Sequence, residues 1–120
     1  MNTVIYIPPD TENKLRHIAQ WFQQRYHFTP SLRQVATFVV STMPEIDIQF
    51  TTTLARTARH QYLHTQAQPL RITKHDHDKL TEFAIRHKHL VGRDTGILFA
   101  ALTNALLFSL NYNQRHERHR

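Results

Sequence analysis

Two stretches of the chain share one pattern of apolar and polar positions. Residues 7–15 (IPPDTENKL) and residues 72–80 (ITKHDHDKL) lie 65 positions apart, and each runs from isoleucine through polar residues to Lys-Leu. Short apolar runs at residues 4–7 and 70–73 lead into them and predict strands. After each leucine the spacing i, i+3, i+4, i+7 predicts one face of a helix. In the first stretch these positions are Leu15, Ile18, Ala19 and Phe22, and Tyr26 continues the same inward face. In the second stretch they are Leu80, Phe83, Ala84 and His87.

A second helical pattern follows in each half. Thr29-Pro30 is a helix start signal, and Leu32, Val35, Ala36 and Val39 after it match Leu98, Ala101, Leu102 and Ala105 with an offset of 66. Asp10 or Thr11, Asp76 or Asp78, and Asp94 or Thr95 are the expected caps of the other helices. The chain therefore predicts strand–helix–helix twice. We expect repeats at residues 1–43 and 68–110, a partly helical connector at 44–67 and a mobile basic tail at 111–120, all in one compact domain.

Composition narrows the classes of function. The 120 residues hold fifteen Lys and Arg against nine Asp and Glu, a formal charge of +6, which favours a polyanionic partner. There is no cysteine, which excludes disulfides and thiolate zinc sites. Ten histidines include the i, i+4 pair His60 and His64, but no set of four ligands is evident, so we expect no metal and no cofactor. No catalytic constellation, signal peptide or membrane-spanning run stands out, which predicts a cytoplasmic non-enzyme without a membrane partner.

Three features of the repeats together resemble the ribbon-helix-helix family of DNA-binding proteins. The first core leucine stands eight positions after the last strand residue, a proline or polar residue follows the strand, and the second helix is capped. The resemblance covers about residues 3–43 and 68–107. It implies a mainly α fold with a short two-stranded antiparallel β-ribbon that enters the DNA major groove. It also implies a tandem pseudo-dimer within one chain, similar to tandem members among plasmid transfer proteins.

Strand alternation then assigns the two faces of the implied ribbon. Inward positions are Ile5, Ile7, Leu70 and Ile72, and outward positions are Val4, Tyr6, Arg71 and Thr73. The outward set is expected to contact bases, with Arg71 suited to bidentate hydrogen bonds to guanine. A solvated edge-strand arginine is the alternative for Arg71, and simple packing is the alternative for Tyr6.

The resemblance also implies phosphate contacts at the start of each second helix, where a helix N-terminus attracts anions. The candidates are Thr29, Ser31 and Arg33 in the first half, and Arg93, Thr95 and Gly96 in the second. Lys74 and the tail residues Arg115, Arg118 and Arg120 add sequence-independent affinity in this interpretation. Ordinary helix capping is the alternative for the helix starts, and a solvated end is the alternative for the tail.

The expected function is sequence-specific binding of double-stranded DNA, most simply as a transcriptional regulator that oligomerises on its site. An accessory protein for a plasmid transfer origin or partition site is one alternative. A protein-interaction module, such as an antitoxin or a phage-encoded inhibitor, is an alternative of another class.

Overall fold

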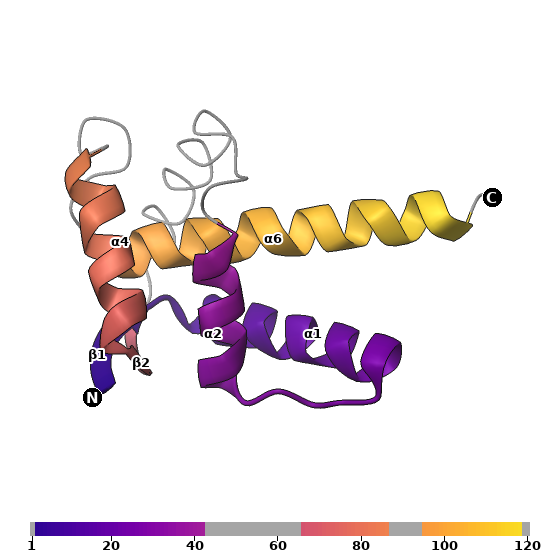
Figure 1. Ribbon diagram of the computed structural model, residues 1–120, viewed down its shortest axis with the longest axis horizontal. Helices are drawn as coiled ribbons and strands as arrows, with labels where there is room; N and C mark the ends of the chain where they lie inside the picture. The colour runs from indigo at the N-terminus through magenta and orange to yellow at the C-terminus, as the bar shows by residue number, and fades with distance from the viewer. Residues whose placement is uncertain (1, 43–65, 87–94, 119–120) are drawn as a thin grey trace.

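The computed structural model describes residues 2–42, 66–86 and 95–118 (Figure 1). Its elements are listed here in chain order: β1 (Asn2–Ile7), α1 (Pro9–Tyr26), α2 (Leu32–Ser41), β2 (Gln68–Thr73), α4 (Lys74–Arg86) and α6 (Thr95–Arg118). The described part of the chain is thus mainly helical with one two-stranded sheet, and its elements follow the order strand–helix–helix twice. This confirms the predicted coarse fold class. The connector at 44–67 lies outside the described residues except for its last two positions.

The two strands pair antiparallel, and we call this pair the ribbon. Ile5 lies opposite Leu70, and Val4 lies opposite Arg71. Residues directly opposite in an antiparallel pair project to the same face. The four predicted inward positions, Ile5, Ile7, Leu70 and Ile72, are all buried. The predicted alternation of the ribbon is therefore correct.

The first helix begins slightly earlier than the sequence predicts. Pro9 is its first residue, and the Thr11 N–H donates to the Pro8 carbonyl oxygen at 2.9 Å. Proline suits the first helical position because its missing N–H would have no partner there. At the other end His27 adopts a left-handed conformation (φ 55°), and its N–H donates to the Gln23 carbonyl at 3.0 Å. This residue ends α1 and turns the chain toward α2.

The predicted starts of two other helices need correction. Ser31, not Thr29, caps α2, through a capping box in which Ser31 and Gln34 exchange side-chain and backbone hydrogen bonds. Helix α4 begins at Lys74, ahead of the predicted Asp76 or Asp78. The Asp76 N–H donates to the Thr73 hydroxyl at 3.1 Å, so the last residue of β2 caps the helix that follows it.

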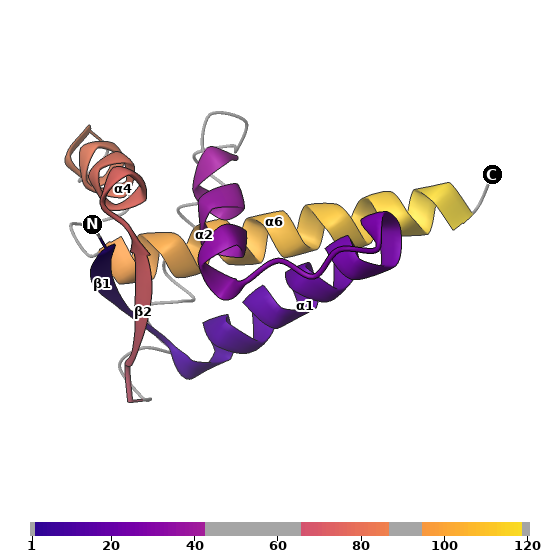
Figure 2. The ribbon, with the colours of Figure 1, turned by 60° about the horizontal axis from the view of Figure 1, so that its bottom comes forward.

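Helix α6 is the central element of the core. Residues 97–103 are all buried in succession, because α1, α2, α4 and β1 surround this segment. A helix that is apolar all round is typical of such a central position. The helix continues to Arg118, so residues 111–118 of the predicted tail are helical. In Figures 1 and 2, α6 and α1 extend in the same direction away from the ribbon.

The two halves pack into each other. Helix α2 of the first half contacts β2 and α4, and helix α6 of the second half contacts β1 and α1. Equivalent positions of the two halves also share their environment. Leu15 and Leu80 are fully buried, and the polar residues Thr11 and Asp76 are only 3% and 2% exposed. One hydrophobic core therefore draws on both halves, as expected for units of about forty residues that are too small to fold alone.

Candidate nucleic-acid interface

The outer ribbon face is the side of the sheet that the helices leave uncovered. Val4 is 41% exposed and Tyr6 is 56% exposed, and Arg71 is exposed as well. The register places Val4 opposite Arg71 and Tyr6 opposite Pro69. Three of the four predicted base-contacting residues thus share one surface, which no described helix covers.

The size of this face follows from its sequence. Two six-residue strands make a ribbon about 20 Å long, and the major groove of B-DNA is about 12 Å wide and admits such a ribbon. A lone pair of strands is marginal in water. Here the inward isoleucines and Leu70 join the helical core, which holds the ribbon in place while its other face stays open.

Thr73, the fourth predicted base contact, caps helix α4. It lies opposite Asn2 at the end of the ribbon and is only half-exposed. Its hydroxyl accepts the Asp76 N–H, as described above. The structure therefore places Thr73 as a helix cap at the margin of the outer ribbon face rather than within it.

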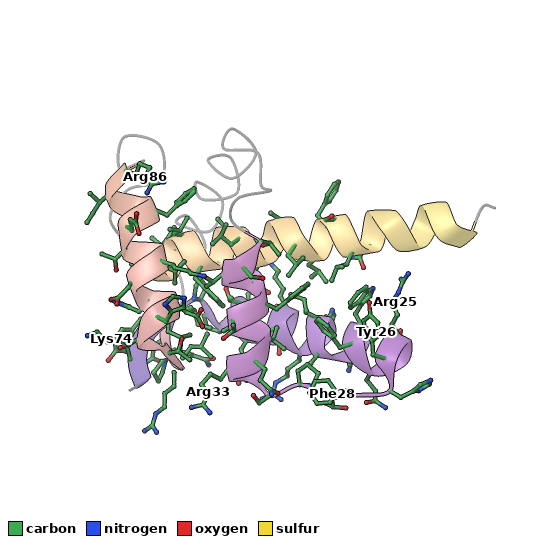
Figure 3. All side chains as sticks on the ribbon, in the orientation of Figure 1. Arg25, Tyr26, Phe28, Arg33, Lys74 and Arg86 are labelled. Carbon is green, nitrogen blue, oxygen red and sulfur yellow. The ribbon has the colours of Figure 1, made fainter. Side chains whose placement is uncertain are left out.

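The start of α2 carries the predicted phosphate contacts of the first half. Arg33 is exposed in the first helical turn and extends toward the same side of the molecule as the ribbon (Figure 3). The Ser31 hydroxyl accepts the Gln34 N–H at 3.2 Å and keeps its own proton for another acceptor. Thr29 instead donates to Gln23 Oε1 at 2.5 Å, which ties the loop to the end of α1. Thr29 is thus a poorer candidate than Ser31 and Arg33.

The second half is less open at the corresponding place. Gly96 is buried and Thr95 is half-buried, so Thr95 is the better candidate for a phosphate contact at this helix start. Arg93 and Arg120 lie outside the described residues, and Arg115 and Arg118 belong to the last turns of α6. Lys74 is the exposed first residue of α4 and lies beside the ribbon in Figure 3. Lys74 is therefore the strongest cationic candidate in the second half.

Three ion pairs among the described residues involve other cations than those beside the ribbon. Asp10 pairs with Lys14 at 2.8 Å, Glu12 with Arg16 at 3.0 Å, and Glu82 with Arg86 at 2.6 Å. All three are i, i+4 pairs on the surfaces of α1 and α4. Neither Arg71 nor Lys74 takes part in them. The cations nearest the outer ribbon face are therefore not used in these pairs.

One polar contact beneath the interface was not expected from the sequence. The Thr37 hydroxyl of α2 donates to Asp76 Oδ2 of α4 at 2.6 Å, and Asp76 is 2% exposed. The repeat offset of 65 is the sequence signal that could have placed Asp76 next to the core. It aligns Asp76 with Thr11, and each of these residues stands four positions before a core leucine.

Other classes of site are not apparent where the structure describes the chain. No cluster of three or more His, Asp or Glu side chains is placed to hold a metal ion. Within the same ranges, every helix is too short or too polar to cross a bilayer. Comparisons with models of known protein families, with curated proteins and with solved structures found no match for this chain.

Proposed function

We propose that this chain is a sequence-specific double-stranded DNA-binding protein that inserts its ribbon into the major groove. The observation that carries the proposal is the outer ribbon face, where Val4, Tyr6 and Arg71 lie exposed on a surface backed by the buried core. Arg71 offers bidentate hydrogen bonds to guanine, and Val4 and Tyr6 offer apolar contacts to thymine methyl groups. The formal charge of +6 favours the encounter with DNA.

The finer architecture in this proposal is a tandem ribbon-helix-helix pseudo-dimer. The order of the elements, the antiparallel ribbon and the reciprocal packing of α2 and α6 across the two halves support it. The two strands carry different outward residues, since Val4 and Tyr6 come from β1 and Arg71 comes from β2. A fused chain of this kind would read two unlike half-sites, which identical subunits do not.

The proposed role is transcriptional regulation in the cytoplasm, without catalysis. Phosphate contacts would come from Ser31, Arg33 and Lys74, with a smaller part for Thr95. These contacts orient the protein on the duplex, whereas the ribbon reads the bases.

Selection from a pool of random duplex DNA tests the proposal. The bound fraction is sequenced after selection at two salt concentrations, first for the unaltered protein and then for Arg71→Ala. Arg16→Ala is the matched control, because Arg16 is an exposed arginine of α1 that pairs with Glu12. We expect an enriched motif with two unlike halves that Arg71→Ala relaxes and Arg16→Ala leaves intact.

Binding without an enriched motif, with a steep loss of affinity in salt, would contradict the proposal, because charge alone would then explain the affinity. The genomic position of an enriched motif has a further use: a promoter indicates regulation, and a transfer origin or partition site indicates the accessory role.

A further inference from the structure

An apolar groove lies between the end of α1, the loop that follows it and α2. Its volume is about 500 Å³. Tyr26 and Phe28 in this groove are 60% and 52% exposed, although the helical pattern predicts that Tyr26 faces the core. We call it the aromatic groove, and its lining is Phe22, Tyr26, Phe28, Pro30, Gln34, Val35, Thr37, Phe38 and Ser41.

The aromatic groove has firm walls and basic surroundings. The rings of Phe22 and Phe38 meet edge to face with centroids 5.0 Å apart, which joins α1 to α2. Arg25 precedes Tyr26 of the groove in the chain and lies over the Trp21 ring at 5.4 Å. Residues 17–42 contain no Asp or Glu, whereas they include Arg25 and Arg33. The groove is therefore suited to an apolar surface that also carries acidic groups.

The chain itself presents such a surface on α4. Asp78, Thr81, Glu82, Ile85 and Arg86 form an open, nearly flat surface on this helix, which we call the α4 outer face. Ile85 is 65% exposed, more than any other large apolar side chain in the described part of the chain. Glu82 and Asp78 stand one and two turns before it on the same side of the helix, and Glu82 is paired there with Arg86.

Comparison of the two halves shows that packing of the repeat does not require this surface. The position equivalent to Ile85 in α1, 65 residues earlier, is Gln20, which is exposed. The equivalents of Asp78 and Glu82 are Asn13 and His17. The first half thus fills the same outer positions with polar residues that carry no negative charge. Among these three positions, the exposed isoleucine and the two carboxylates therefore occur in the second half alone.

The aromatic groove and the α4 outer face lie at opposite ends of the molecule. Helix α4 occupies one end in both Figure 1 and Figure 2, and the end of α1 occupies the other. Figure 3 places Tyr26 and Phe28 on the side away from Arg86. The longest dimension of the molecule is 41 Å. One molecule therefore cannot bring its own two surfaces together.

We propose that the two surfaces bind each other between copies of the chain, with the α4 outer face of one copy seated in the aromatic groove of the next. Such a contact is heterologous, so a pair of copies still has one unused groove and one unused face, and further copies add in a row. On DNA, which rests on the proposed function, this contact would align neighbouring copies head to tail.

The contact is expected to be weak in free solution. Both surfaces are small, and interfaces that bury less than about 1,200 Å² are typical of transient association. The formal charge of +6 on each copy also opposes association at low ionic strength. Phe28 and Ile85 are the side chains expected to lose the most exposure.

Sedimentation of the full-length protein without DNA, over a range of protein concentrations at about 0.15 M salt, tests the proposal. The groove variant is Phe28→Ser, and the face variant is Ile85→Gln, which installs the residue that the first half carries at the equivalent position. Tyr6→Ser is the control for the groove, because Tyr6 is an aromatic residue of similar exposure on the ribbon. We expect the average mass of the unaltered protein and of Tyr6→Ser to rise with concentration. Each surface variant should associate about tenfold or more weakly, as expected for one large apolar side chain removed from a contact.

Mixing the two variants gives the decisive result. The groove variant keeps an intact face and the face variant keeps an intact groove, so an equal mixture should form a heterodimer and no longer assembly. Thermal unfolding checks that both variants remain folded. The proposal is overturned if the unaltered protein stays monomeric throughout, if the variants associate as it does, or if the mixture shows no heterodimer. The assay contains no DNA, so a negative result leaves the DNA-binding proposal standing.

Discussion

The hydroxyl of Thr37 and the carboxylate of Asp76 form a hydrogen bond 2.6 Å long that links the two halves of the chain. Thr37 belongs to the second helix of the first half, and Asp76 belongs to the first helix of the second half. The backbone N–H of Asp76 also donates to Thr73 at the end of the ribbon. Thr37 stands one turn after Arg33, so this short chain of contacts connects the ribbon to the helix that carries a proposed phosphate contact.

Removing this hydrogen bond should destabilise the fold. Thr37→Val keeps the volume of the side chain but leaves the buried carboxylate without its hydroxyl donor, so we expect a loss of about 1–3 kcal/mol in the free energy of unfolding. Urea denaturation of Thr37→Val, Asp76→Asn and the double variant measures the coupling between the two residues. We expect a coupling of about 1 kcal/mol, within the range for directly contacting residues.

Two further threonine variants serve as controls for this cycle. Thr37→Ser retains the hydroxyl and should lose less than Thr37→Val. Thr103→Val also removes a buried threonine hydroxyl, but that hydroxyl donates to the Phe99 carbonyl of its own helix at 2.9 Å and links no halves. Additive losses from Thr37→Val and Asp76→Asn would show that the contact does not couple the halves.

Leu15 and Leu80 should act on one and the same unfolding transition. Both are fully buried at equivalent positions of the two halves, and the core they enter is shared. Leu15→Ala and Leu80→Ala are each expected to cost about 2–5 kcal/mol. Because neither half buries enough surface to fold alone, calorimetry and denaturant unfolding should show a single transition that shifts as a whole.

Gln20→Ala is the surface control for these two variants and should change stability by less than about 0.5 kcal/mol. Two separable transitions, with Leu15→Ala moving one and Leu80→Ala moving the other, would mean that the halves fold independently. That result would argue against the reciprocal packing of α2 and α6.

The strands and the buried helical faces could be predicted because their periods are local properties of the sequence. Ile5, Ile7, Leu70 and Ile72 alternate as a half-buried ribbon requires, and the offset of 65 makes the pattern visible twice. Helix starts were less predictable. Asp76 and Asp78 were both candidates for the cap of α4, and neither of them is the cap. Thr73 caps the helix, whereas Asp76 is buried against Thr37, a contact between residues 39 positions apart that no local pattern reveals.

The exposed features at the end of α1 were missed for a related reason. The apolar spacing continues to Tyr26 and predicts burial there, but the ring is 60% exposed at the aromatic groove. Spacing shows which side of a helix an apolar residue lies on, and the neighbouring elements decide whether that side is covered. The helical tail was missed because its polarity indicates exposure, which is compatible with the end of a long helix.

Arg33 and Lys74 should contribute to DNA affinity without contributing to sequence preference. A residue that neutralises one phosphate changes the slope of log affinity against log salt concentration by about 0.9. Arg33→Ala and Lys74→Ala are each expected to reduce the slope by about one and to weaken binding to all sequences alike. Fluorescence anisotropy with an enriched and a scrambled duplex, at four or more salt concentrations, measures both effects.

The Arg16→Ala variant again provides the comparison, since Arg16 lies on α1 in an ion pair with Glu12. Its slope should equal that of the unaltered protein. A change of preference between the two duplexes on Arg33→Ala would show that Arg33 reads bases, and an unchanged slope would remove it from the interface.

Thr73 should act as a helix cap rather than as a base-reading residue. Thr73→Val removes the hydroxyl that accepts the Asp76 N–H, and the loss of such a cap costs about 0.5–2 kcal/mol. Thr73→Ser keeps the hydroxyl and removes only the methyl group, so stability should stay close to that of the unaltered protein. If capping is the main task, Thr73→Ser should also keep the same preferred DNA sequence in the random-pool selection. A relaxed preference at one thymine position in Thr73→Ser would instead assign the methyl group to base contact, because that group is the part of the side chain that recognises thymine.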